Sequence, residues 1–130
     1  MSQCVGCITN SGPGYASPET AIRGPRETLL YVTCVQPNGL AEQKPDYVAV
    51  IDVNPVSDNY CQVLSRCLMP TCGDELHHSG WNSCSSCYND PTLKRDKLIL
   101  PCLRSNRVYI VDIGDGINLK VDGVRIFHLT

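Results

Sequence analysis

Two ten-residue stretches, "DYVAVIDVNP" (residues 46–55) and "NRVYIVDIGD" (residues 106–115), decide the expected fold because they repeat each other at an offset of 60. The matching pairs are Val48 with Val108, Val50 with Ile110, Ile51 with Val111, Asp52 with Asp112 and Val53 with Ile113. Each copy follows another apolar run, "LLYVTCV" in the first case and "LILPCL" in the second. A recurring strand pair is typical of β-propeller blades, which take ~40–50 residues each. Two similar hairpins of a β-sandwich would produce the same pattern.

The other apolar runs are also short, rich in β-branched and aromatic residues, and separated by Gly, Pro, Asn and Asp. The predicted strands are Leu29–Val35, Tyr47–Val53, Cys61–Leu64, Lys97–Leu103 and Arg107–Ile113. One helical turn is predicted at Glu19–Arg23, after Ser17-Pro18. The sequence therefore predicts an all-β chain.

Length limits how much of a propeller this chain can form. A ring has roughly 4–8 blades, and 130 residues hold about two of them. We expect a partial β-propeller with an irregular lead-in at residues 1–28, incomplete blades at residues 29–115 and a divergent tail at residues 116–130. Blades without neighbours leave apolar faces and edges uncovered, so self-association is expected.

Composition excludes several classes of partner. The 11 basic and 13 acidic residues are mixed, which gives no electrostatic reason to expect nucleic acid or an anionic membrane. The first residues lack a secretory pattern, and no apolar run is long enough for a transmembrane segment. These features predict a cytosolic protein, with the nucleus as a second location. In those compartments the nine cysteines are expected as thiols or ligands rather than disulfides.

The stretch "ELHHSGWNSCSSC" (residues 75–87) concentrates candidate metal ligands. Imidazole suits copper, and thiolate suits Cu(I) and zinc, so His77, His78, Cys84 and Cys87 are all chemically suitable. On a regular strand the two histidines would point to opposite faces, unless Ser79-Gly80 introduces a bend or bulge. On the residues alone, histidines held by ordinary hydrogen bonds are the commoner case.

The pair Cys84 and Cys87 has three interpretations. A redox dithiol would need a lowered thiol pKa and is usually found in a βαβ setting, which the sequence does not predict. A zinc site would need two more thiols, which Cys67 and Cys72 could supply, because the other Cys-x-x-Cys (residues 4–7) is distant in sequence. Surface-loop thiols without either role are the commonest outcome.

Three further residues are expected to be structural. Asp52 and Asp112 recur at the ends of equivalent strands, where a carboxylate can accept hydrogen bonds from turn amides. Trp81 is expected to anchor its loop by burying its ring.

Several motifs together resemble the N-terminal part of the selenium-binding protein family, also known as methanethiol oxidase. They are "SGPGYASPETAIRGPRE", "PDYVAVIDVNP", "YCQV", "DELHHSGWNSCSSC" and "SNRVYIVDIGD", and they cover about residues 4–115. The resemblance implies a longer, seven-bladed propeller that uses copper to convert methanethiol, oxygen and water into formaldehyde, hydrogen peroxide and hydrogen sulfide. It does not extend into residues 116–130.

The resemblance also implies site residues. It places a copper ligand on at least one of His77 and His78, and selenium on Cys61, whose thiol would otherwise be expected as a small buried group. The remaining copper ligands and the catalytic residues are not identified, so the short chain is expected to be an inactive fragment. Two alternatives are a selenium- or thiol-reactive binding protein that uses Cys61, and a small zinc module built on Cys67, Cys72, Cys84 and Cys87.

Overall fold

The structure is a computed structural model that describes residues 12–127. These residues form two compact units. The smaller unit contains residues 12–25 and 82–95, and the larger one contains residues 26–81 and 96–127. None of the helices within residues 12–127 has the length or apolar character needed to span a bilayer.

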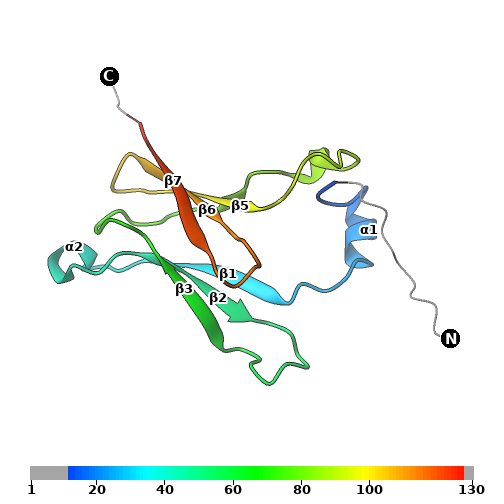
Figure 1. The fold of residues 1–130 in the computed structure, drawn as a ribbon, viewed down its shortest axis with the longest axis horizontal. Helices are drawn as coiled ribbons and strands as arrows, with labels where there is room; N and C mark the ends of the chain where they lie inside the picture. Colours follow the sequence, from blue (N-terminus) through cyan, green and yellow to red (C-terminus); the bar gives the residue numbers. More distant parts are fainter. Residues whose placement is uncertain (1–11, 128–130) are drawn as a thin grey trace. The chain divides into compact units, whose positions relative to one another are not determined.

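The larger unit begins with a three-stranded antiparallel sheet (Figure 1). Its strands are β1 (Leu29–Cys34), β2 (Tyr47–Asp52) and β3 (Val63–Leu68), in the spatial order β1-β2-β3. The short helix α2 (Gly39–Glu42) lies between β1 and β2 in the chain. The predicted pairing of the first two strands is confirmed.

The second sheet of this unit has four antiparallel strands. They are β4 (Gly80–Trp81), β5 (Lys97–Pro101), β6 (Arg107–Asp112) and β7 (Lys120–Ile126), again in sequence order. The predicted pairing of β5 with β6 is confirmed. Strand β7 lies within the expected divergent tail, yet it pairs with β6 along its length, from Arg107 opposite Ile126 to Asp112 opposite Lys120. The tail therefore contributes a regular strand to this sheet.

The internal repeat is visible in the backbone as well as in the sequence. Strands β2 and β6 both end at an aspartate, and each has an irregularity in its pairing with the following strand. The irregularity falls between Val50 and Ile51 in β2 and between Ile110 and Val111 in β6, which is the same offset of 60. The two register shifts therefore extend the sequence repeat to the pairing of the strands.

The two sheets pack against each other as layers around one apolar core (Figure 1). Strand β2 contributes Val48 and Val50, whereas β6 contributes Tyr109 and Val111. Because the repeat aligns Val48 with Val108, the core-cluster residues of β6 fall one position out of phase with those of β2, whose Ala49 is buried outside that cluster. Successive residues of a strand point to opposite faces. The sheets therefore bury opposite faces of equivalent strands and pack front to back.

The repeated aspartates are turn braces, as the sequence indicates. One carboxylate oxygen of Asp52 accepts a hydrogen bond from the backbone N–H of Asn54 at 2.8 Å. The carboxylate of Asp112 accepts the corresponding bond from the N–H of Gly114 at 2.7 Å. These bonds stabilise the turn that follows each copy of the strand.

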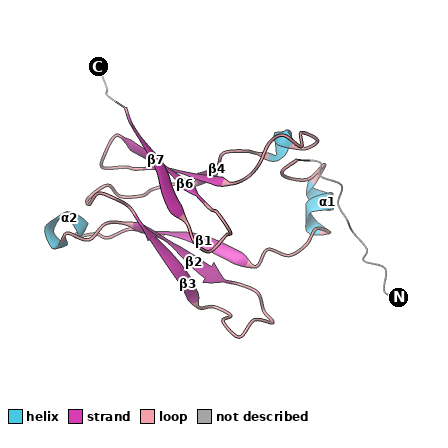
Figure 2. Ribbon diagram, viewed as in Figure 1, coloured by secondary structure: helices cyan, strands magenta, loops and turns pink. Residues whose placement is uncertain are grey.

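The smaller unit is mostly loop (Figure 2). Helix α1 (Pro18–Ile22) confirms the predicted helical turn, and the Ser17 hydroxyl accepts a hydrogen bond from the N–H of Thr20 at its start. A 3₁₀ turn, η1, covers Ser85–Cys87. Gly12 has φ +79°, and a Cβ atom there would lie 2.3 Å from the carbonyl oxygen of Asp90. A side chain at position 12 would therefore push apart the loops that contain Gly12 and Asp90.

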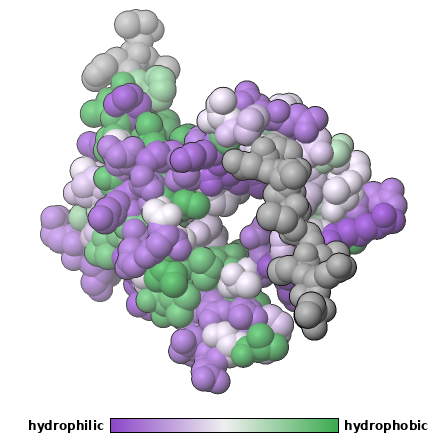
Figure 3. Space-filling model, turned by 45° about the vertical axis from the view of Figure 1, so that its right-hand side comes forward, coloured by the Kyte–Doolittle hydropathy of each residue, from purple (hydrophilic) through white to green (hydrophobic). Residues whose placement is uncertain are grey.

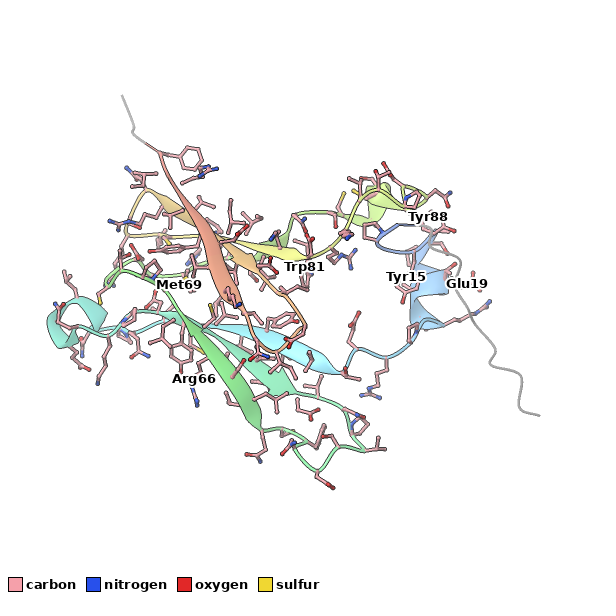
Figure 4. The ribbon with its side chains drawn as sticks, in the orientation of Figure 1. Tyr15, Glu19, Arg66, Met69, Trp81 and Tyr88 are labelled. Carbon is pink, nitrogen blue, oxygen red and sulfur yellow. The ribbon has the colours of Figure 1, made fainter. Side chains whose placement is uncertain are left out.

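Two local predictions are wrong. Strand β3 begins at Val63, so Cys61 lies in the preceding turn and does not share a strand face with Val63. Trp81 keeps 38% of its surface exposed, and its ring meets Tyr31 edge-on with 5.9 Å between centroids (Figure 4). Strand β4 has only two residues and lies at the sheet edge, so little protein is available to cover the tryptophan ring.

Candidate functional site

The two adjacent histidines follow the core residue Leu76 in the chain and precede strand β4. Residues 77–79 have no regular secondary structure, which removes the alternation that a strand would impose. Both imidazoles are exposed, and their rings face each other edge-on with centroids 4.3 Å apart. The expectation that His77 and His78 point to opposite sides is therefore wrong, because these residues lie outside any strand and their rings are in contact. Two imidazoles are presented together at the surface.

The segment just before the histidines is held by a buried carboxylate. Asp46 accepts hydrogen bonds from the backbone N–H of Leu76 and of Gln36, both at 2.8 Å. Leu76 is itself part of the core, and the N–H of His77 donates to the carbonyl of Pro101 at 3.1 Å. Sequence reasoning missed this role of Asp46, since nothing in the residue order shows which amides its carboxylate meets.

A second buried carboxylate, that of Asp74, is bonded to side chains of strand β6. It is 1% exposed and forms an ion pair with Arg107 at 2.7 Å. It also accepts hydrogen bonds from the hydroxyls of Tyr109, at 2.5 Å, and Thr71. Burial alone would raise the pKa of Asp74, but the bonds from Thr71, Tyr109 and Arg107 lower it below its ordinary value. The carboxylate is therefore ionised at neutral pH.

Glu75, between the two anchored residues, completes the local geometry. Its backbone is left-handed, with φ 58°, and its carboxylate pairs with the guanidinium of Arg104 at 2.5 Å. Such a conformation is uncommon outside glycine and persists where neighbouring contacts hold it. Residues 74–76 thus provide a fixed base for the exposed histidine pair.

Metal binding by the described residues alone is limited by the number of ligands. Within residues 12–127 no group of three or more His, Cys, Asp or Glu side chains could hold a metal ion. The imidazoles of His77 and His78 suit copper in donor type. Further ligands would have to come from outside this part of the chain.

The proposed selenium residue, Cys61, lies in an exposed turn between β2 and β3. Its backbone is left-handed, with φ 63°, and its N–H donates to the carbonyl of Asp52 at 2.8 Å. A non-glycine residue in this region costs roughly 1–2 kcal/mol relative to ordinary backbone. The strain and exposure distinguish this thiol from the small buried group that the sequence alone favours.

The remaining described cysteines have different environments. Cys67 is buried in the core, where burial raises the pKa of its thiol. Burial likewise raises the pKa of Cys102 to about 11, with a contribution from the negative charge of Asp74. Zinc binds the thiolate rather than the thiol, so a raised pKa disfavours Cys67 as a zinc ligand. Cys72 is half-buried and Cys84 is exposed.

The fold and its surface groups define a β-sheet protein with an anchored pair of imidazoles and several free thiols. The family described as 56kDa selenium binding protein (SBP56) matches residues 9–124. The chain belongs to this family. The match continues beyond residue 115, where we expected the resemblance to end, and includes most of β7.

Several proteins named methanethiol oxidase are similar to this chain. The protein from Danio rerio is 53% identical over 113 residues, which is 87% of this chain and 24% of that protein. The Xenopus tropicalis protein is 54% identical over 114 residues, covering 88% and 23%. The human protein is 53% identical over 105 residues, covering 81% and 22%. The chain spans about a quarter of the length of the relatives it matches.

A solved structure shows the same fold. The X-ray structure of a hypothetical selenium-binding protein from Sulfolobus tokodaii matches with a TM-score of 0.76 and 39% sequence identity. The similarity covers 90% of this chain and 26% of that chain. The arrangement of sheets described above is therefore shared by that relative over the matched segment.

Proposed function

We propose that the chain is the N-terminal part of a copper-dependent methanethiol oxidase. In the proposed reaction methanethiol, oxygen and water give formaldehyde, hydrogen peroxide and hydrogen sulfide. The observation that carries the proposal is the 53% identity over 113 residues with a protein named methanethiol oxidase. A match of that length within 130 residues necessarily includes the histidine pair.

In this proposal His77 and His78 are copper ligands. Copper would supply the redox chemistry toward oxygen. The histidines would bind the ion through ring nitrogens, while Asp46 and Asp74 keep the preceding backbone fixed through the bonds described above. Because residues 12–127 present no three-ligand group, turnover would require ligands from the part of the enzyme outside them.

We further propose that the two sheets are successive propeller blades. Three observations support stacked blades over a sandwich of two facing hairpins: the offset of 60, the bulge at equivalent positions and the front-to-back packing. The outer face of the first sheet exposes Leu30, Val63 and Leu68. Apolar residues are also visible at the surface in Figure 3. Another blade, or a second copy of the chain, would cover such a face.

A chimera tests whether this segment can serve in a methanethiol oxidase. The matching region of the Danio rerio protein would be replaced by residues 12–127 of this chain, and oxygen uptake with methanethiol would be measured. We expect activity within about tenfold of the parent, since roughly half of the aligned residues are identical and the fold is shared. The parent protein, expressed in parallel, is the control. A folded chimera without methanethiol-dependent oxygen uptake would contradict the proposal.

A second proposed function is covalent selenium binding at Cys61. Its support is the exposed, strained position of this thiol and the selenium-binding description of the family. An accessible thiol can react with selenite, whereas Cys67 is buried, Cys102 is half-buried, and burial raises the pKa values of both thiols.

Labelling with selenite tests this second function. We expect Cys61→Gly to lose most of the selenium label while keeping the fold, because glycine adopts a φ of 63° without strain. Cys72→Ser is the matched control and should retain the label. Selenium recovered equally from the Cys61→Gly variant and the unaltered chain would assign the label to another cysteine.

A further inference from the structure

The Cys84-Ser-Ser-Cys87 segment folds as one closed turn that brings its two cysteines together. The N–H of Cys87 donates to the carbonyl of Cys84 at 3.1 Å, and residues 85–87 form the 3₁₀ turn η1. The turn lies in the smaller unit, directly before Tyr88, which is labelled in Figure 4. A Cys-x-x-Cys pair held in one turn is close enough in sequence and space to form a disulfide after small side-chain movements.

The two thiols have different environments. Cys84 is exposed, whereas Cys87 is half-buried. The sulfur of Cys84 lies 2.7 Å from the hydroxyl oxygen of Ser86. Hydrogen bonds from Ser86, and also from Cys87, lower the pKa of the Cys84 thiol below its ordinary value. Cys84 is therefore suited to attack an oxidant, and Cys87 is placed to react with the product.

A hollow borders the two serines of the turn. Ser85 and Ser86 line a hollow of about 390 Å³ together with Tyr15, Ser17 and Arg95, all of which belong to the same unit. Neither cysteine lines this hollow; a peroxide molecule can reach the Cys84 sulfur because that side chain is itself exposed.

We propose that Cys84 and Cys87 form a peroxide-reactive dithiol that closes reversibly into a disulfide. The Cys84 thiolate attacks one oxygen of hydrogen peroxide, the O–O bond breaks, and the released hydroxide takes up a proton to leave as water. Cys84 is then a sulfenic acid. The Cys87 sulfur attacks the Cys84 sulfur, an S–S bond forms, and the sulfenic oxygen leaves as a second water. Peroxide is reduced by two electrons, which the two thiols supply, and a thiol reductant restores the dithiol.

The other described cysteines provide internal comparisons. Burial raises the pKa values of Cys67 and Cys102, which makes both thiols poor nucleophiles at neutral pH. Cys61 is exposed but has no second cysteine within the same turn. Oxidation that ends in an intramolecular disulfide is therefore expected first at the Cys84-Ser-Ser-Cys87 turn.

Peptide mapping of the complete chain tests the inference without any measurement of enzyme activity. The reduced protein would be treated with one equivalent of hydrogen peroxide, its remaining thiols alkylated, and its peptides analysed by mass spectrometry. We expect the peptide that contains Cys84 and Cys87 to lose two hydrogens and escape alkylation, and dithiothreitol to reverse this. Its rate should exceed the oxidation rate of Cys102 at least about tenfold.

Variants separate the two steps. Cys87→Ser should stop at the sulfenic acid and yield a dimedone adduct on Cys84, whereas Cys84→Ser should leave Cys87 as a thiol. Ser86→Ala should slow the reaction severalfold, while Ser85→Ala should not, because the hydroxyl that bonds to the Cys84 sulfur is that of Ser86. A dimedone adduct absent from Cys84 in the Cys87→Ser variant, or a disulfide from Cys84 to Cys4, Cys7 or Cys61 instead of Cys87, would overturn the inference.

Discussion

Replacing Asp74 with alanine should lower the free energy of unfolding by about 3 kcal/mol, which is a large share of the stability of a small domain. The carboxylate is almost fully buried and accepts bonds from Arg107, Tyr109 and Thr71. Its loss would leave a partly buried guanidinium and a fully buried phenol without their acceptor. Chemical denaturation of the purified chain would measure the change.

Asp122→Ala is the matched control for this prediction. Asp122 also pairs with a cation, Lys97, at 3.3 Å, but its side chain is 56% exposed. An exposed pair contributes about 0–1 kcal/mol, so this variant should remain close to the unaltered chain. An effect of Asp74→Ala as small as that of Asp122→Ala would show that the buried network does not stabilise the fold.

The contribution of Asp74 should also depend on pH. Its pKa is lower in the folded chain than the unfolded value of 3.8, because the hydrogen bonds outweigh the opposing effect of burial. The unfolded state therefore binds the proton first as the pH falls. The stabilisation is fully present above the unfolded pKa and decreases as the pH drops through the folded one. The stability difference between the unaltered chain and Asp74→Ala should accordingly shrink in that acidic range.

The repeating strand pattern predicted most of the sheet structure. β-branched runs bounded by turn residues are a local signal, and β1, β2, β5 and β6 all form where that signal is strong. The offset of 60 also placed the turn-bracing aspartates and, in the structure, the two bulges. A repeat helps prediction because each copy forms the same kind of structural unit, so the strands and turns of one copy indicate those of the other.

The remaining features depend on contacts that residue order does not display. Strand β7 contains Gly123 and charged residues, and its pairing with β6 stabilises it despite a weak local pattern. Cys61 lies in a left-handed turn because the backbone closes a hydrogen bond to Asp52 there. The buried roles of Asp46 and Asp74 likewise depend on partners far away in the chain.

The histidine pair shows the same limit within the candidate site. Strand alternation correctly separates neighbours in β5, but it does not apply to residues 77–79, which lie outside any strand. The segment is instead held at Leu76 by Asp46 and at His77 by the Pro101 carbonyl. The sequence showed that the alternation could be broken near Ser79-Gly80, but it did not show that residues 77–79 lie outside any strand.

Alanine at either His77 or His78 should reduce copper binding strongly in the chimeric methanethiol oxidase described above. The two rings lie 4.3 Å apart and both are exposed, so neither is buried as a structural residue. Loss of a group that only orients a metal ligand typically reduces affinity ~10–100-fold, and loss of a ligand should reduce it at least as much. Metal analysis after dialysis, together with oxygen uptake, would measure both consequences, and we expect copper content and activity to fall in parallel.

Ser79→Ala is the control for this pair, because Ser79 is the next exposed residue and lacks an imidazole. It should retain copper and activity, which would show that substitution in this segment is tolerated when the ligands remain. A double His77→Ala and His78→Ala variant should fall little below the single variants if both rings bind one ion, since removing either already breaks the site. Full copper content in both single variants would place the metal elsewhere in the enzyme. A large loss at only one histidine would leave the other as its structural neighbour, and the facing arrangement of the rings would then reflect packing rather than shared coordination.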